Sequence, residues 1–180
     1  MDYDFGDILD ARNAPSIGHF ILVVGQITRK DKVTKLDITE VMYYIITSRV
    51  YAVFKNILVY FNDCLSRKDK NFLKHYGKEK DKATISAHGQ LSQAIFLDKE
   101  TNYNACLDVE SMVVINSDPL LIDKTALETL KADGKIIYKN KLVKLDAKHL
   151  IETIKCSNDV SSSRKEKISA CLNKIKASLR

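Results

Sequence analysis

The sequence predicts an α+β protein, in which an N-terminal helix-on-sheet region precedes a small C-terminal domain of the order α-β-β-β-α. Short apolar runs rich in β-branched residues, typical of strands, alternate with segments in which apolar residues recur every three or four positions, as in helices. Among 180 residues there are only 2 prolines and 6 glycines, so regular structure should dominate. The hydrophobic fraction of 45% is enough for a sizeable core.

The first elements expected along the chain are an arm, a strand and a loop. Residues 1–18 are acidic and carry Pro15 and Gly18 as breaks. Residues 19–27 read HFILVVGQI, a β-branched apolar run that predicts a buried strand. The polar residues 28–35 then predict a turn or the loop of a hairpin.

Residues 37–65 form the most apolar segment, and their pattern predicts one largely buried helix or a self-association face. Asp37 or Thr39 can cap its start. Polar residues recur at intervals that leave only a narrow polar stripe on such a helix. The many β-branched and aromatic residues also allow two strands. A membrane span is disfavoured because Arg49 and Lys55 lie inside the segment.

Residues 66–82 are strongly basic, and an antiparallel sheet is expected after them. Phe72 and Tyr76 are one helical turn apart, so we expect an exposed helix that docks through them, with base stacking as the alternative. Residues 98–102 predict a hairpin turn. The runs that predict strands are residues 83–91, 93–97, 103–109 and 111–115.

A change in charge accompanies the expected domain boundary at the polar residues 117–119. Residues 124–180 contain 14 basic and 6 acidic residues, whereas residues 1–123 contain 15 and 17. In a chain of net charge +6, this asymmetry suggests that the C-terminal part meets a polyanion, the alternative being a solvated lysine-rich surface. We therefore expect an oligomerisation or partner-docking region, residues 1–116, and a basic nucleic-acid-binding domain, residues 117–180.

The C-terminal domain should begin with a helix and two strands. Asp118 or Asp123 caps a helix over residues 124–132, and Gly134 ends it. The alternating runs GKIIYKN and KLVKL, which together span residues 134–145, predict two strands.

The third expected strand of this domain is predicted less clearly than its final helix. Residues 149–156 fit a strand, or a short helix capped by Asp146. The final helix, within residues 161–180, has a triple-serine start, a basic first turn and an apolar stripe. The stripe consists of Ile168, Cys171, Leu172, Ile175 and Leu179.

Sequence signatures of catalysis are not found. The chain contains no glycine-rich phosphate loop, no G-x-S-x-G and no H-E-x-x-H, and its four histidines are isolated. We expect a protein that is not an enzyme and needs no cofactor or metal.

The widely spaced cysteines predict reduced, buried thiols in a cytoplasmic protein, and the N-terminus has no signal-peptide pattern. The composition suits an AT-rich genome, such as that of a virus. The cysteines are Cys64, Cys106, Cys156 and Cys171.

The C-terminal segment resembles a double-stranded RNA-binding domain. Glu128 and Tyr138 are spaced like the acidic residue of that family's first helix and the tyrosine of its first strand. The run from Ser163 to Glu166 resembles the start of its last helix. Ile168 departs from the family pattern, because a lysine is usual there. Leu150, Ile154 and Cys156 match the apolar spacing of the second strand.

This resemblance implies a protein that recognises duplex RNA by its shape and its phosphates. Apart from the resemblance, we expect no membrane association, and we expect the N-terminal region to form a homo-oligomer or to dock a partner. It would place Glu128 at one minor groove, Lys148 or His149 at the next, and Arg164 with Lys165 on phosphates at a helix N-terminus. The residues that we expect to contact nucleic acid are Glu128, Lys144, Lys148, His149, Ser163, Arg164, Lys165 and Lys167.

Two other functions remain open at this stage. A structural or interaction protein could assemble through the apolar residues 37–65, with the basic C-terminus only keeping it in solution. A winged-helix protein could bind duplex DNA through a helix over residues 124–132 and a two-strand wing around residues 139–141.

Overall fold

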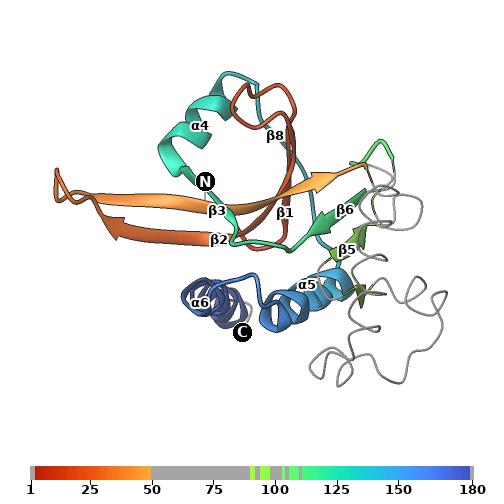
Figure 1. Cartoon of the computed structure of the whole chain (residues 1–180). Coiled ribbons are helices and arrows are strands. Elements are labelled where there is room, and N and C mark those ends of the chain that lie inside the picture. The colour runs from red at the N-terminus through yellow and green to blue at the C-terminus, as the bar shows by residue number, and fades with distance from the viewer. Residues whose placement is uncertain are drawn as a thin grey trace.

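The computed structural model shows a sheet-dominated α+β protein, which confirms the predicted class (Figure 1). It describes residues 3–49, 90–91, 94–97, 103, 106–109 and 111–178, with side chains of the last helix described as far as Leu172. One curled antiparallel sheet lies between helices on both of its faces. Its strands are β1 (Asp7–Ala11), β2 (His19–Lys30), β3 (Asp37–Thr47), β4 (Gln90–Leu91), β5 (Ala94–Leu97), β6 (Ser111–Val114), β7 (Leu120–Asp123) and β8 (Ile137–Lys141).

The sheet has the order β4-β5-β6-β3-β2-β1-β8, and β7 also pairs with β3. Strands β7 and β8 follow residue 117 in the chain but pair with β3 and β1, which precede it. The two expected regions therefore contribute to a single sheet. The helices are α4 (Lys124–Ala132), α5 (Lys144–Cys156) and α6 (Ser162–Ser178).

The prediction of a helix from residue 37 is wrong, because residues 37–47 form the central strand β3. The strand pairs with β2 from Lys30↔Asp37 to Phe20↔Ile46, and it also pairs with β6 and β7. Its alternate side chains are buried on opposite faces of the sheet, so a continuous apolar run is expected. This part of the segment offers no exposed helical face for self-association. Residues 50–65 and the basic segment 66–82 lie outside the described residues.

The expected order α-β-β-β-α is also wrong in its second half. Residues 144–156 form helix α5, so the strands expected over residues 141–145 and 149–156 are not formed. The second option for residues 149–156, a helix, is confirmed, although Asp146 lies inside its first turn and Val143 occupies the N-cap. Strand β8 pairs with β1 and forms no wing with a neighbouring hairpin strand.

Other local predictions hold in part. Helix α4 is confirmed, with the carboxylate of Asp123 accepting from the N–H groups of Thr125 and Ala126. Strand β2 and helix α6 are confirmed as well. Residues 103–109 are no strand where they are described, since Cys106 and Leu107 both donate their N–H groups to the Tyr103 carbonyl in a turn. The hairpin turn expected over residues 98–102 lies outside the described residues.

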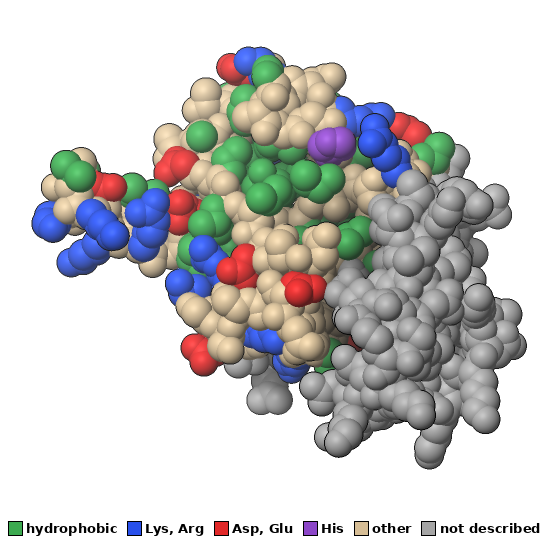
Figure 2. Space-filling model, in the orientation of Figure 1, with side chains coloured by type: hydrophobic (Ala, Val, Ile, Leu, Met, Phe, Trp, Pro, Cys, Tyr) green, Lys and Arg blue, Asp and Glu red, His purple; other side chains and the backbone are tan. Residues whose placement is uncertain are grey.

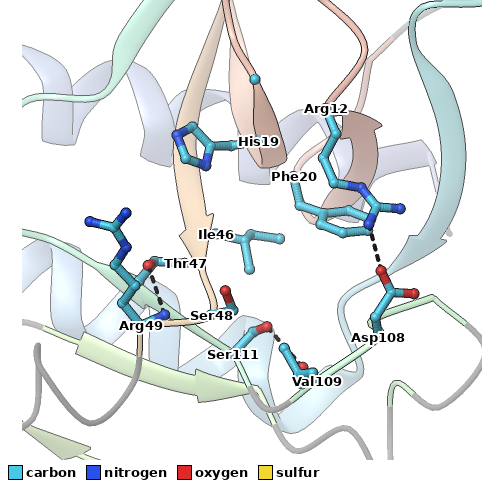
Figure 3. A pocket seen from close by; sticks show the side chains of 11 residues that line it. Arg12, His19, Phe20, Ile46, Thr47, Ser48, Arg49, Asp108, Val109 and Ser111 are labelled. Carbon is cyan, nitrogen blue, oxygen red and sulfur yellow. Dashed lines mark hydrogen bonds and ion pairs between the residues drawn. The ribbon is translucent and has the colours of Figure 1, made fainter.

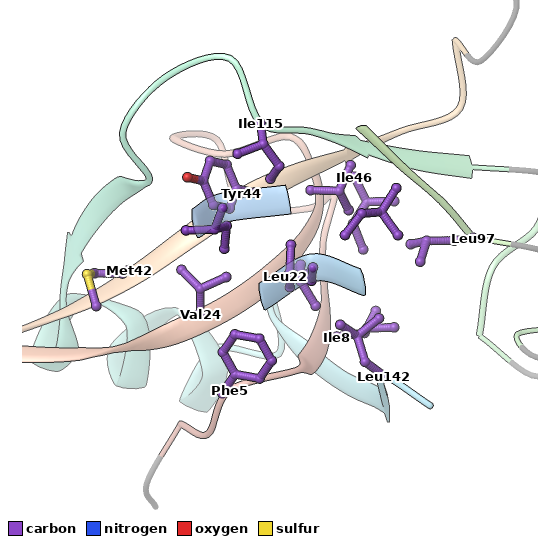
Figure 4. Packing of buried hydrophobic residues seen from close by; sticks show 14 of the residues in the cluster. Phe5, Ile8, Leu22, Val24, Met42, Tyr44, Ile46, Leu97, Ile115 and Leu142 are labelled. Atoms are coloured by element: carbon purple, nitrogen blue, oxygen red, sulfur yellow. The ribbon is translucent and has the colours of Figure 1, made fainter. Parts of the chain in front are cut away.

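The core lies on both faces of the sheet because successive side chains of a strand point to opposite sides. On one face, Leu22 and Met42 belong to a cluster that α5 and α6 cover with Leu150 and Ile168 (Figure 4). On the other face, α4 inserts Leu127 into a second cluster. This arrangement sets α4 and the α5–α6 pair on opposite sides of the sheet (Figure 1).

In the described part of the chain, no helix is long and apolar enough to cross a membrane. The thiol prediction holds for Cys106, which is buried, and is wrong for Cys156, which is exposed. Cys171 is half-buried, and Cys64 lies outside the described residues. Burial raises the pKa of the Cys106 thiol above its ordinary value. Cys106, Cys156 and Cys171 are free thiols.

Candidate nucleic-acid interface

A two-stranded arm formed by residues 28–39 projects from the body of the protein (Figure 1). Its ladder pairs Thr28 with Thr39, Arg29 with Ile38 and Lys30 with Asp37. Strand β1 pairs with β2 only up to Leu22, and β7 pairs with β3 only from Glu40 onward, so the arm pairs with itself alone among the described strands. We call residues 28–39 the β2–β3 arm.

Hydrogen bonds to Asp31 stabilise the tip of the β2–β3 arm, residues 31–36. The Asp31 carboxylate accepts hydrogen bonds from the N–H groups of Val33 and Thr34, at 3.0 and 2.7 Å, and from the Thr34 hydroxyl. These bonds lower the pKa of the Asp31 carboxyl, with the Thr34 N–H as the largest cause. Lys35 adopts a φ of 60°, the sole positive φ among the described residues other than glycine. The tip is thus an ordered turn.

Cationic side chains gather over the β2–β3 arm (Figure 2). Residues 28–39 carry four basic and two acidic residues. Arg29 is committed to Glu40 through two hydrogen bonds of 2.9 and 3.1 Å, which hold the pKa of Glu40 below its usual value. Lys30 and Lys32 form no ion pair with any described carboxylate, and the Lys35 ammonium group donates to the Lys32 carbonyl. The arm therefore presents three lysines that form no ion pair with a described carboxylate, although Lys30 lies opposite Asp37 in the ladder.

Glu128, the first of the sequence-predicted contacts, lies on α4 and is exposed. It is close enough to Tyr3 for its charge to raise the pKa of the Tyr3 hydroxyl, after the larger effect of burial. Because α4 and α6 cover opposite faces of the sheet, Glu128 does not share a surface with Arg164 or Lys165. The structure does not bring together the residue set that the resemblance implies.

The predicted contacts on α5 lie at or near its solvent-facing side. Lys144 and Lys148 are exposed and one helical turn apart, and His149 is half-buried. The exposed Glu152 lies on the same helix and partly offsets their charge. Lys144 and Lys148 are therefore accessible to a polyanion.

Of the predicted contacts at the start of α6, two residues are exposed and two are half-buried. Ser163 and Lys167 are exposed. The Lys165 ammonium group donates a 2.5 Å hydrogen bond to the Ser157 carbonyl. Arg164 is half-buried; its Nη1 has no hydrogen-bond partner among the described residues, and its charge helps to lower the pKa of Glu40. Lys165 is thus bonded to the body, whereas Arg164 is half-buried with its Nη1 unpaired among the described residues.

The N-terminus of α6 already has an anionic partner. The Asp118 carboxylate accepts the Ser161 N–H at 2.8 Å and the Ser161 hydroxyl at 3.0 Å. A carboxylate at this position interacts favourably with the positive end of the helix dipole. The N–H and hydroxyl of Ser161 are therefore already bonded to a carboxylate at this helix terminus.

A small pocket of about 160 Å³ lies where β1, β2 and β3 approach Asp108, Val109 and Ser111 (Figure 3). The Arg12 guanidinium lies 4.3 Å from the centroid of the Phe20 ring and pairs with Asp10 and Asp108. Its hydrogen bond to Asp10 is the largest cause that lowers the pKa of that carboxyl. Among the described residues, no hydroxyl or carboxylate forms a hydrogen bond with His19.

The described residues contain no group of His, Cys, Asp and Glu side chains able to hold a metal ion. The basic arm was missed as a site, because residues 28–35 appeared only as a polar hairpin loop. Its signal was present in the run TRKDKVTK, with four cations in eight positions. Comparisons with known protein families, curated proteins and solved structures found no match.

Proposed function

We propose that the protein is a non-enzymatic nucleic-acid-binding protein that holds a duplex chiefly through its phosphates. The observation that carries this proposal is the projecting β2–β3 arm with its lysines Lys30, Lys32 and Lys35. Lysines on a duplex release condensed counterions, which supplies affinity that is independent of sequence. The net charge of +6 adds long-range attraction for a polyanion.

The shape of the arm supports a double-stranded ligand. A two-stranded ribbon can enter the major or the minor groove of B-form DNA, whereas the major groove of A-form RNA is narrow and deep. Duplex RNA is the other candidate ligand, and a ribbon would contact it along the backbone and the shallow minor groove. Both duplexes belong to the proposal, and the binding assay ranks them.

The exposed lysines on α5 and α6, Lys144, Lys148 and Lys167, form a second candidate surface. They lie on the face of the sheet that α5 and α6 cover, where α6 packs against β2 (Figure 1). We assign them a supporting role because each extends from a helix surface instead of a projecting element. The arm should therefore contribute more affinity than this second surface does.

The test is fluorescence anisotropy with an RNA duplex, a DNA duplex and single strands of the same length, at several salt concentrations. For the full-length protein we expect tighter binding to a duplex than to single strands. On B-form DNA, the slope of log K against log salt should approach about −0.9 for each phosphate that is neutralised. A slope near zero, or equal affinity for duplex and single strand, would contradict the proposal.

Two matched triple variants then locate the surface. One replaces Lys30, Lys32 and Lys35 with glutamine, and the other replaces the second-surface lysines Lys144, Lys148 and Lys167 in the same way. Both remove three positive charges, so a difference between them reports position and not net charge. We expect the arm variant to lose at least about tenfold in affinity and the second variant to lose less. Equal losses would show that only overall charge matters.

A further inference from the structure

The tip of the β2–β3 arm carries the two most exposed large apolar side chains of the described residues. Val33 is 87% exposed and Leu36 is 68% exposed. Single exposed apolar residues are common on protein surfaces. Val33 and Leu36, however, lie in one turn at the end of a projecting element. They form an apolar tip flanked by the cationic side chains of Lys32 and Lys35.

The apolar tip lies in a hydrogen-bonded turn, which would serve insertion into a partner. The N–H of Val33 is bonded to the Asp31 carboxylate. Two backbone bonds, from Asp31 N–H to the Leu36 carbonyl at 2.8 Å and from Lys35 N–H to the Asp31 carbonyl at 3.1 Å, close the turn around it. Val33 is β-branched and stiff about its first side-chain torsion. A turn ordered before binding loses little conformational entropy when it binds.

We propose that Val33 and Leu36 act as a wedge that inserts at a base step of a bound duplex, partly unstacks it and bends the duplex. Apolar side chains inserted between base steps kink DNA, and the bend brings more phosphates within reach of basic groups. Here Lys30, Lys32 and Lys35 would hold the flanking phosphates. Flexible pyrimidine–purine steps should be preferred, since they unstack at the lowest cost. This proposal rests on the duplex-binding function proposed above.

A base step suits this tip better than a lipid surface does. Membrane anchoring by an amphipathic element requires a long apolar face, and even one myristoyl chain binds membranes only weakly. Two side chains present too little apolar area for stable anchoring, whereas one or two are enough to open a base step. Anionic vesicles are nevertheless included in the test.

The experiment uses the full-length protein and a short DNA duplex with a central TA step that carries 2-aminopurine. A second duplex of the same sequence carries a donor and an acceptor dye at its ends. Binding of the parent protein should raise the 2-aminopurine fluorescence and increase energy transfer between the two dyes.

The double variant Val33→Ser with Leu36→Ser should lose both signals but bind within about tenfold of the parent, because its lysines remain. The control variant Leu145→Ser, exposed elsewhere on α5, should keep both signals.

The outcomes separate this inference from the function on which it depends. Salt-dependent duplex binding without either signal would overturn the wedge and leave the binding function intact. No duplex binding by the parent protein would overturn both. Retention of both signals in the double variant would also overturn the wedge. The wedge would also be overturned by a third result: the parent protein binds phosphatidylserine vesicles and leaves the duplex unbent, and the double variant loses the vesicle binding.

Discussion

Cys171 of α6 lies directly against Gly25 of β2. Its thiol donates a 3.3 Å hydrogen bond to the neighbouring Gln26 carbonyl, and a Cβ on Gly25 would lie 2.7 Å from its sulfur. Gly25 follows a β-bulge and has a φ of 142°. The bulge turns Ile27 toward the same face as Leu22, so β2 continues to bury apolar side chains under α6. This contact sets how closely the helix approaches the base of the arm.

Gly25→Ala should destabilise the protein by about 2–4 kcal/mol, because both the backbone strain and the collision with Cys171 oppose the new methyl group. Gly18→Ala is the matched control: Gly18 also has a positive φ, of 71°, but nothing lies within 4 Å of its added Cβ. It should lose only the strain, about 1–2 kcal/mol. Urea denaturation measures both losses. Equal losses would show that α6 yields without cost.

Tyr103→Phe should destabilise the protein by about 1–3 kcal/mol, because its hydroxyl joins two groups at the start of α5. It donates a 2.6 Å hydrogen bond to Asp146 and accepts the Val143 N–H at 3.2 Å. The residue is fully buried, which raises the pKa of its hydroxyl well above the ordinary value. Thermal unfolding measures the loss, and Tyr138→Phe, at an exposed position, should change stability by less than about 0.5 kcal/mol.

The order of the arm tip should depend on pH through Asp31. Its ionised form is bonded in the turn, so its pKa is lowered relative to the unfolded chain. The stabilisation is complete above the ordinary aspartate pKa of about 3.9 and is lost as pH falls through the lowered value. Amide chemical shifts of Val33 and Thr34 should report this transition. Asp31→Asn, which does not ionise, should remove the pH dependence at these two amides; its persistence would assign the transition to another group.

Glu40→Gln should tighten duplex binding about two- to tenfold, because it releases Arg29 from its ion pair at the base of the arm. The salt dependence on a DNA duplex should steepen by about 0.9 if Arg29 then neutralises one more phosphate. Glu152→Gln on α5 makes the same change in net charge at an exposed site away from the arm. Anisotropy titrations should show a smaller gain for this control, and an equal gain would assign the effect to net charge.

Capping residues and short apolar runs were enough to predict α4 as a helix and β2 as a strand. Asp123 and Gly134 mark the ends of α4, and Leu127 is buried at the expected position on its apolar face. The β-branched run of β2 likewise predicted a strand. These features depend on residues close in sequence, so they are visible without the rest of the chain.

Strand β3 could not be distinguished from a helix by its pattern, because a strand buried on both faces has a continuous apolar run like that of a buried helix. Its partners decide its structure: β2 pairs along it on one side, while β6 and β7 pair on the other. The candidate site was obscured for a related reason. Which lysines are accessible depends on packing, as the Lys165 bond to the Ser157 carbonyl shows.

The sequence by itself determined the α+β class, the capped helix α4, the strand β2, the helix α6 and the excess of positive charge. Only the tertiary structure decided that β7 and β8 join the N-terminal strands in one sheet, which separates Glu128 from α6 by the thickness of that sheet. It also decided that residues 28–39 project as an arm. Strand pairing and helix packing join residues far apart in the chain, and no local spacing encodes which of them will meet.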